Sequence, residues 1–91
     1  MLSLVWRASA LDDLATIIDY IAERDEAAAD RLQSAIEACA ERLPDHPYLY
    51  RPGRVAGTRE AVVHPNYIIV YRVTAEAVEI VALVHARREY P

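Results

Sequence analysis

The sequence of 91 residues contains no lysine and a single cysteine, Cys39. One cysteine cannot form an internal disulfide, and it excludes a cysteine-rich zinc site. No apolar segment is long enough to span a membrane, because charged residues interrupt every such stretch. The N-terminus also lacks the basic start, the long apolar segment and the cleavage site of a signal peptide. These absences predict a cytoplasmic protein that does not bind membranes.

Phosphate-binding and metal-binding motifs are missing as well. The chain has no glycine-rich loop, and the three histidines, His46, His64 and His85, are too far apart in sequence for metal-ligand spacing. Cys39 falls on an apolar helical stripe, which indicates a core residue. We therefore expect no metal ion and no cofactor.

The composition is that of one small folded domain. Apolar residues make up 54% of the chain and charged residues 26%, which argues against disorder. At this length we expect a single domain over residues 1–91. A domain of this size buries a limited share of its surface, so a bound partner would add to its stability.

The net charge of −4 is unevenly distributed. Residues 1–47 carry four arginines against ten acidic residues, whereas residues 48–91 carry six arginines against four glutamates. A general nucleic-acid binder would be far more basic. No segment resembles a helix-turn-helix with a basic recognition helix either. We therefore expect no sequence-specific DNA binding by this chain.

Two amphipathic helices are predicted in the acidic half. The first begins at Ser9, which with Asp12 resembles a capping box, and it ends near Arg24. Its apolar residues recur at helical spacing: Leu11, Leu14, Ile17, Ile18 and Ile21. The second helix opens at Asp25 and stops before Pro44. The very short connection between them predicts an antiparallel helical hairpin.

Strands are predicted at residues 2–7, 58–64, 67–73 and 78–85. The segment 44–57 holds three prolines and two glycines, which indicates a loop. Residues 67–73 are apolar on nearly both faces, as in a central strand. The order β-α-α-β-β-β predicts an α+β fold of two layers, with the helical hairpin packed on a mainly antiparallel four-strand sheet.

Polar side chains gather near the ends of the predicted strands. Arg59 lies on the second strand, and His85, Arg87 and Tyr90 lie at or beyond the end of the last one. Arginines, an imidazole and a phenol could clamp a phosphate and move a proton, which is the chemistry of RNA cleavage by its own 2′-hydroxyl. The same residues would suit the binding of an acidic peptide, or a solvated sheet edge with local salt bridges.

Four segments, in this order and spacing, carry a family resemblance: residues 6–21, 53–60, 67–73 and 83–91. Together they resemble the RelE/ParE superfamily of toxins from bacterial type II toxin–antitoxin systems, along the whole chain. The resemblance implies the fold predicted above and an antitoxin protein as partner. The scaffold carries different activities: RelE-like members cut mRNA on the ribosome, and ParE-like members inhibit DNA gyrase.

Three departures from RelE-like enzymes place the chain nearer to ParE-like members. RelE-like enzymes carry an arginine of the phosphate clamp where this chain has Ile68, and they continue into a C-terminal helix with a catalytic tyrosine where this chain stops at Pro91. They are also rich in lysine and strongly basic, as binding to ribosomal RNA requires. The resemblance therefore favours a gyrase inhibitor that blocks replication and is not an enzyme; if the chain is an enzyme, the resemblance implies an mRNA endoribonuclease.

The resemblance leaves three hypotheses open. As a gyrase inhibitor, the chain would contact its target through Arg87, Arg88 and Tyr90. As a ribosome-dependent mRNA endoribonuclease, it would hold phosphate with Arg59 and Arg87. In that case His85 or Tyr90 would act as acid or base. As an inactive toxin, it would survive only as a binding partner of its antitoxin.

All three hypotheses share the antitoxin partner. We expect the antitoxin to add along a sheet edge or to fill an apolar groove against the helices. The candidate contacts are Leu14, Ile18, Tyr20, Arg59 and Arg72. Basic antitoxin residues could meet the acidic helical half, and the antitoxin is expected to carry the DNA-binding element.

Overall fold

A computed structural model describes residues 2–87 of the chain. The elements, in chain order, are β1 (Ser3–Trp6), α1 (Ala8–Ala22), α2 (Glu26–Arg42), β2 (Arg51–Pro52), β3 (Thr58–His64), β4 (Tyr67–Val73) and β5 (Ala77–His85). The strands form one sheet in the order β1-β5-β4-β3-β2. Only β1 and β5 run parallel to each other. The expected α+β fold is confirmed, with β2 as a fifth strand inside the predicted loop.

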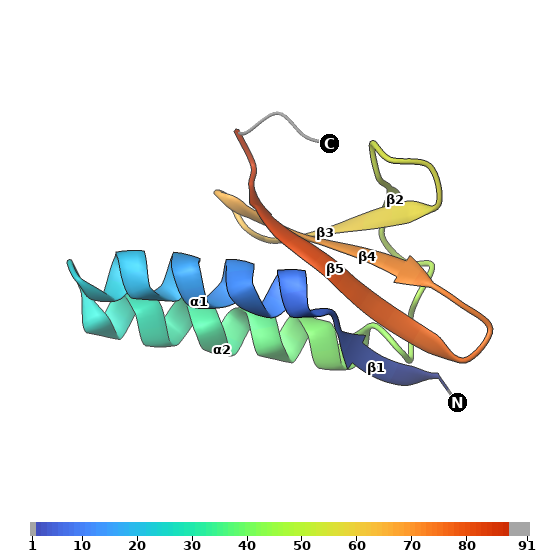
Figure 1. The fold of residues 1–91 in the computed structure, drawn as a ribbon, viewed down its shortest axis with the longest axis horizontal. Coiled ribbons are helices and arrows are strands. Elements are labelled where there is room, and N and C mark those ends of the chain that lie inside the picture. Colours follow the sequence, from blue (N-terminus) through green and yellow to red (C-terminus); the bar gives the residue numbers. More distant parts are fainter. Residues whose placement is uncertain (1, 88–91) are drawn as a thin grey trace.

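The helical hairpin covers one face of the sheet, and its far end extends beyond the sheet (Figure 1). Ile36 of α2 and Leu43, the residue that caps the end of α2, are fully buried in one core with Ile69 and Tyr71 of β4. Cys39 belongs to the same core and is free, which confirms its predicted place. Neither helix, within residues 2–87, is long and apolar enough to cross a membrane.

The predicted central strand is confirmed, since β4 lies between β3 and β5 and is buried on both faces. Side chains alternate along a strand. Ile69 and Tyr71 face the helices, and Ile68 and Val70 face away from them. All four are at most 4% exposed. The sheet therefore has a face covered by helices and a second face without a helical layer, which we call the open face.

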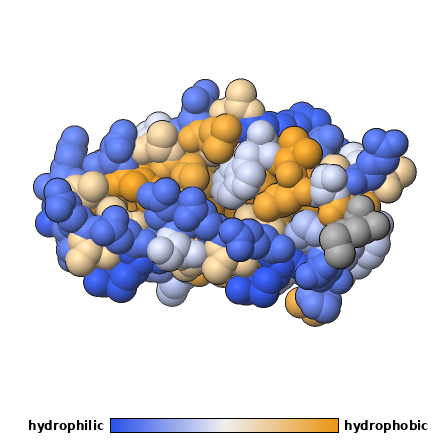
Figure 2. All heavy atoms as spheres, turned by 90° about the horizontal axis from the view of Figure 1, so that it is seen from below, coloured by the Kyte–Doolittle hydropathy of each residue, from blue (hydrophilic) through white to orange (hydrophobic). Residues whose placement is uncertain are grey.

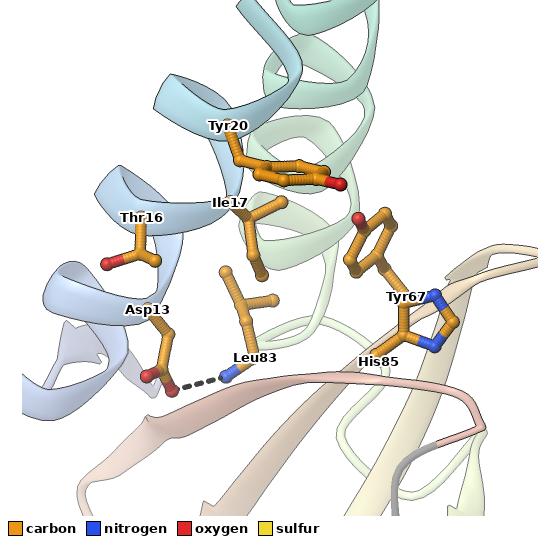
Figure 3. A pocket seen from close by; sticks show the side chains of 7 residues that line it. All are labelled: Asp13, Thr16, Ile17, Tyr20, Tyr67, Leu83 and His85. Atoms are coloured by element: carbon orange, nitrogen blue, oxygen red, sulfur yellow. Dashed lines mark hydrogen bonds between the residues drawn. The ribbon is translucent and has the colours of Figure 1, made fainter.

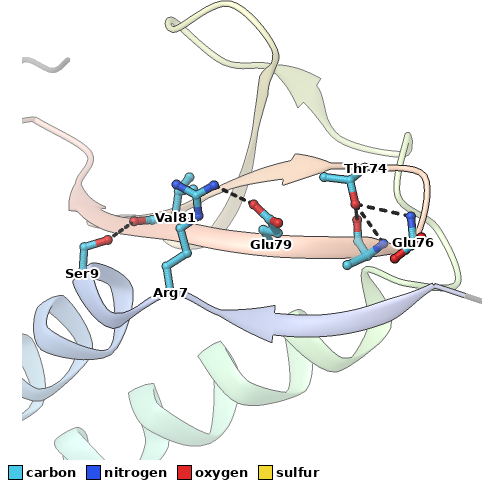
Figure 4. A network of polar contacts seen from close by, with 7 residues as sticks. Arg7, Ser9, Thr74, Glu76, Glu79 and Val81 are labelled. Atoms are coloured by element: carbon cyan, nitrogen blue, oxygen red, sulfur yellow. Dashed lines mark hydrogen bonds and ion pairs between the residues drawn. The ribbon is translucent and has the colours of Figure 1, made fainter.

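Helix α1 begins at Ala8 with Arg7 as its N-cap, and no side chain caps it. The predicted capping box of Ser9 and Asp12 is therefore wrong. The Ser9 hydroxyl instead donates to the backbone carbonyl of Val81 in β5, at 2.9 Å (Figure 4). Because α1 packs against the sheet, the Ser9 hydroxyl bonds to a carbonyl of β5 instead of to a backbone N–H of its own helix. The start of α1 therefore has no side-chain cap.

The start of α1 completes the hydrogen bonding of β5 where β1 ends. Strand β1 pairs with β5 only as far as Trp6, whose partner is Ile80. Beyond that point a carboxylate oxygen of Asp13 accepts the backbone N–H of Leu83 at 3.0 Å, next to the bond from Ser9. Polar side chains of α1 thus satisfy backbone groups of β5 that would otherwise lack a partner strand.

The loop between α2 and β3 is held to the sheet by a tyrosine and an arginine. The Tyr71 hydroxyl donates to the carbonyl of Pro47 at 2.8 Å, and the Arg59 guanidinium donates to the carbonyl of Tyr50 at 2.8 Å. Burial raises the pKa of Tyr71 to about 12, although the Arg59 guanidinium acts in the opposite direction. Burial also raises the pKa of Tyr50. Both phenols are therefore protonated at neutral pH.

Candidate functional site

The residues considered for RNA cleavage are spread over the sheet. Arg59 pairs with Tyr71 in the register of β3 with β4, whereas His85 pairs with Tyr67 at the other end of β4. The four-residue step from Tyr67 to Tyr71 corresponds to about 13 Å along a strand. The Arg59 guanidinium is also engaged by the carbonyl of Tyr50. Arg59 and His85 therefore do not converge on one phosphate position.

The residues considered for target binding follow β5 in the sequence. Arg87 is exposed, and its backbone N–H donates to Nδ1 of His85 at 3.2 Å. Arg88 and Tyr90 lie outside the described residues. His85 lies edge-on against the Tyr67 ring, with the ring centroids 5.3 Å apart. The histidine therefore lies on the helix-covered side of the sheet, against the ring of Tyr67.

The open face of the sheet has a mainly apolar floor. A shallow pocket of about 400 Å³ on this face is lined by Arg7, Val55, Thr58, Val70, Arg72, Val81, Ala82 and Val84. Ile68, which is 3% exposed, faces the same side. The resemblance described above implies a clamp arginine at this position in RelE-like enzymes. Four of the eight lining residues are valines and two are arginines, so this face is mainly apolar with positive charge at its margin.

Two ion pairs lie at the margins of the open face. Arg7 contacts Glu79 at 2.8 Å, and both side chains are partly exposed (Figure 4). Arg51 contacts Glu60 at 2.9 Å, and the Glu60 side chain is only 4% exposed. Arg72, a candidate antitoxin contact, is half-buried beside the pocket, and neither of these two pairs includes it.

The five candidate antitoxin contacts do not form one surface. Leu14 and Ile18 are half-buried on α1 and pack against the core. Tyr20, also on α1, is 57% exposed. Arg59 and Arg72 belong to opposite faces of the sheet, since Arg59 pairs with the helix-facing Tyr71. Leu14 lines the groove beside β1 and Tyr20 lines a different pocket, so the helix residues are themselves divided between two places.

An apolar groove lies between β1 and the helices. It has a volume of about 300 Å³ and is lined by Leu4, Trp6, Leu11, Leu14, Glu37 and Glu41. Seen from below, an apolar strip runs along the molecule between rows of polar side chains (Figure 2). Leu11 in this groove is 49% exposed. An apolar groove with an acidic rim fits a partner segment that carries both apolar and basic side chains.

A second pocket lies between α1 and the ends of β4 and β5 (Figure 3). It has a volume of about 270 Å³ and is lined by Asp13, Thr16, Ile17, Tyr20, Tyr67, Leu83 and His85. We did not predict this pocket from the sequence. Its lining joins one helix to strands about 50 to 70 residues later in the chain, and no local pattern reports such a contact.

The described residues contain no group of three or more His, Cys, Asp or Glu side chains that could hold a metal ion. The ionisable residues that gather in the second pocket include one carboxylate, Asp13, and one imidazole, His85. The chemistry available there is hydrogen bonding and charge pairing rather than metal coordination.

Comparison with known proteins gives matches along almost the whole chain. Residues 4–90 match the family described as ParE toxin of type II toxin-antitoxin system, parDE. The chain is 38% identical over 87 residues to toxin Y4kP of Sinorhizobium fredii, which covers 94% of this chain and 90% of that protein. It is 39% identical over 90 residues to toxin RelE2 of Caulobacter vibrioides, which covers 97% of this chain and 99% of that protein.

The fold is also similar to that of a solved structure of the chromosomal ParDE TA system from P. aeruginosa. The TM-score is 0.84 at 22% identity, and the match covers 93% of this chain and 96% of that one. This similarity supports the fold, and the sequence matches support the family. The chain belongs to the ParE toxin family of type II toxin–antitoxin systems, within the RelE/ParE superfamily.

Proposed function

We propose that this toxin inhibits DNA gyrase and that its cognate antitoxin neutralises it by direct binding. Toxins of this family act in toxin–antitoxin pairs, so the proposal concerns the target. The observation that carries it is the apolar open face. Ile68 replaces the clamp arginine of RelE-like enzymes, and Val70 and Val84 line the pocket on the same face. Such a surface favours a protein target over an RNA backbone.

The charge distribution supports the same target. A toxin that enters the ribosome must approach ribosomal RNA, and this approach is favoured by a basic surface. This chain has a net charge of −4 and no lysine. Its helical layer carries most of the acidic residues, which would repel RNA.

Arg59 and the two tyrosines of the loop tether give no support for proton transfer at a phosphate, so an endoribonuclease would depend on His85 or Tyr90. The Arg59 guanidinium is engaged by loop carbonyls, and the phenols of Tyr50 and Tyr71 have raised pKa values. A phenol with a raised pKa is a poor general base at neutral pH. We therefore propose an inhibitor that acts by binding.

The proposed contact with gyrase is the basic C-terminal end, formed by Arg87, Arg88 and Tyr90. Arg87 is exposed at the end of β5. Arginine and tyrosine are the residue types that most often dominate the energy of protein interfaces. Gyrase works on the chromosome, so the proposed place of action is the cytoplasm.

The first experiment is a DNA supercoiling assay with purified gyrase and the purified toxin. We expect the toxin to inhibit supercoiling. The double variant Arg87→Ala with Arg88→Ala should need at least about tenfold more protein for the same inhibition, because a loss of about 1.4 kcal/mol changes binding tenfold. Arg31→Ala removes one positive charge from the exposed side of α2 and should remain within about twofold of the original protein.

Cells that express the toxin without antitoxin separate the alternatives. If DNA synthesis falls before protein synthesis, gyrase is supported as the target. If protein synthesis falls first and mRNA acquires 2′,3′-cyclic phosphate ends, the gyrase proposal is wrong and the chain is an endoribonuclease. If growth continues while the antitoxin still binds, the chain is an inactive toxin.

A further inference from the structure

The pocket between α1 and the ends of β4 and β5 is lined by apolar side chains, a carboxylate and aromatic rings. Ile17 and Leu83 are apolar and lie between Asp13 on one side and Tyr67 on the other (Figure 3). Tyr20 adds a second aromatic ring from the next turn of α1. The pocket is open to solvent at this ring, since Tyr20 is 57% exposed.

Asp13 provides the negative charge of this pocket. One of its carboxylate oxygens accepts the Leu83 N–H at 3.0 Å, which fixes the side chain against β5. No ion pair within residues 2–87 includes Asp13. Arg24 stacks on Tyr20, with the guanidinium carbon 4.1 Å from the ring centroid, but it does not line the pocket. A held carboxylate without a cationic partner favours a positively charged ligand.

The two tyrosine rings favour the same charge. A cation gains free energy over the face of an aromatic ring. Tyr67 is positioned by two neighbours, with ring centroids 5.3 Å from His85 and 5.8 Å from His64. The apolar lining between the rings and the carboxylate would receive the methylene groups of a long basic side chain. An anionic ligand would instead face Asp13.

We propose that this pocket binds one arginine or lysine side chain of the antitoxin. The cationic group would pair with Asp13 and contact the rings of Tyr20 and Tyr67, and the methylene groups would pack on Ile17 and Leu83. The proposal rests on the proposed function in one respect, namely that the antitoxin binds this chain directly. It is independent of which target the toxin inhibits.

The charge of the surrounding surface points to a basic partner rather than a second copy of this chain. Residues 1–47 carry ten acidic residues against four arginines. The groove between β1 and the helices, which shares no lining residue with this pocket, also has two glutamates in its lining, Glu37 and Glu41. Two copies that met through these surfaces would bring like charges together, which opposes association.

The test measures the affinity of the purified toxin–antitoxin pair by calorimetry. Asp13→Asn removes the charge but keeps an amide oxygen that can accept the Leu83 N–H. We expect this variant to bind at least about tenfold more weakly, the effect of losing about 1.4 kcal/mol. Asp12→Asn is the matched control, because Asp12 is exposed on the same helix and does not line the pocket. It should remain within about twofold of the original protein.

Two tyrosine variants separate the rings from their hydroxyls. Tyr20→Leu removes an exposed ring, so it should fold normally, and it should weaken binding by about fivefold through the lost cation–π contact. Tyr67→Phe keeps the ring and should bind within about twofold of the original protein. Equal melting temperatures of all variants would show that the changes in affinity do not come from misfolding.

A double-mutant cycle identifies the occupant. Each arginine and lysine of the antitoxin is changed to glutamine and measured against the original toxin and against Asp13→Asn. We expect one basic residue whose loss costs affinity with the original toxin and costs almost nothing with Asp13→Asn. The absence of any coupled residue would overturn the proposal.

Two further outcomes separate this proposal from the choice of gyrase. If Asp13→Asn binds antitoxin as tightly as Asp12→Asn does but loses gyrase inhibition, the pocket contacts the target and the inference is wrong. If the original toxin does not affect gyrase while Asp13→Asn still binds antitoxin weakly, the inference holds and the gyrase proposal fails.

Discussion

The two faces of the sheet are equally buried along β4, but they are closed by different means. On the helix-covered face Ile69 and Tyr71 are fully buried beneath α1 and α2. On the open face Ile68 and Val70 are 3% and 4% exposed with no helical layer over them. Their cover comes from neighbouring side chains of the sheet and the adjoining loop. The helix-covered face therefore serves the stability of the fold. The open face buries the side chains of β4 and still leaves a surface that a partner can reach.

The difference has a functional meaning in a toxin that must bind both a target and an antitoxin. The helical layer is acidic and offers a groove and a pocket at its border with the sheet. The open face is apolar with arginines at its margin. Two partners of different chemistry can thus be recognised at different places on a chain of 91 residues.

The largest expected effect compares two adjacent isoleucines of β4. Ile69→Ala should lower the free energy of unfolding by about 3 kcal/mol, because the helices above it cannot close the cavity. Ile68→Ala should cost about 1.5 kcal/mol, because no helix covers the side chains around it, and they can shift or admit water. Urea unfolding of both variants measures the difference.

Equal losses for the two alanine variants would contradict the comparison. They would mean that the open face is packed as rigidly as the core beneath the helices. A loss at Ile68 that grows when antitoxin is bound would show instead that the partner covers this face.

Much of the fold could be predicted because it depends on local patterns. The apolar run of residues 67–73 predicted a central strand, and Pro44 marked the end of the second helix. Strand β2 was missed because two residues carry no periodicity. The role of Ser9 was mistaken because its acceptor, the carbonyl of Val81, is 72 residues away in the sequence.

The candidate site was less predictable for the same reason. The pairing of Tyr67 with His85 depends on the register of β4 with β5, and that register is irregular between Val70 and Tyr71. The contact of Asp13 with Leu83 spans 70 residues. Composition and spacing show which residue types are present. Only the packing of α1 on the sheet brings Asp13, Tyr67 and His85 into a single pocket.

A second prediction compares the two ion pairs of the open face. Arg51→Ala should cost about 2 kcal/mol, because it removes the guanidinium that pairs with Glu60, whose side chain is 4% exposed. Arg7→Ala should cost about 0.5 kcal/mol, because a pair with exposed partners contributes little. Side-chain exposure in that pair is 52% for Arg7 and 25% for Glu79.

Thermal unfolding of the two arginine variants measures these costs. Adding Glu60→Gln to the Arg51→Ala variant serves as the control, since it removes the buried charge that has lost its guanidinium and keeps the donor from the Arg54 backbone N–H. Stability should partly recover in the double variant. A double variant less stable than Arg51→Ala alone would show that the cost comes from lost packing of the arginine rather than from the uncompensated carboxylate.

A third prediction concerns the tether between β4 and the loop before β2, and its effect depends on pH. Tyr71→Phe should cost about 1 kcal/mol at pH 8, because the Pro47 carbonyl loses its hydrogen-bond donor. The pKa of Tyr71 is raised to about 12 in the folded protein, from 10.0. Between these values the phenol ionises in the unfolded chain but stays protonated in the folded one. Ionisation then favours unfolding, so the stability that this group contributes declines as pH rises from 10 to 12.

The phenylalanine variant has no ionisable group at this position and should lack that decline. The difference in unfolding free energy between the two proteins should therefore be constant up to about pH 9.5, shrink above it and reverse sign at about pH 11. Urea unfolding of both proteins at a series of pH values tests this, and the other tyrosines cancel because both proteins contain them. A difference that stays constant up to pH 11 would mean that the Tyr71 hydroxyl titrates as it does in water. The tether would then be open to solvent, and the helix-covered face would be less completely closed than its burial indicates.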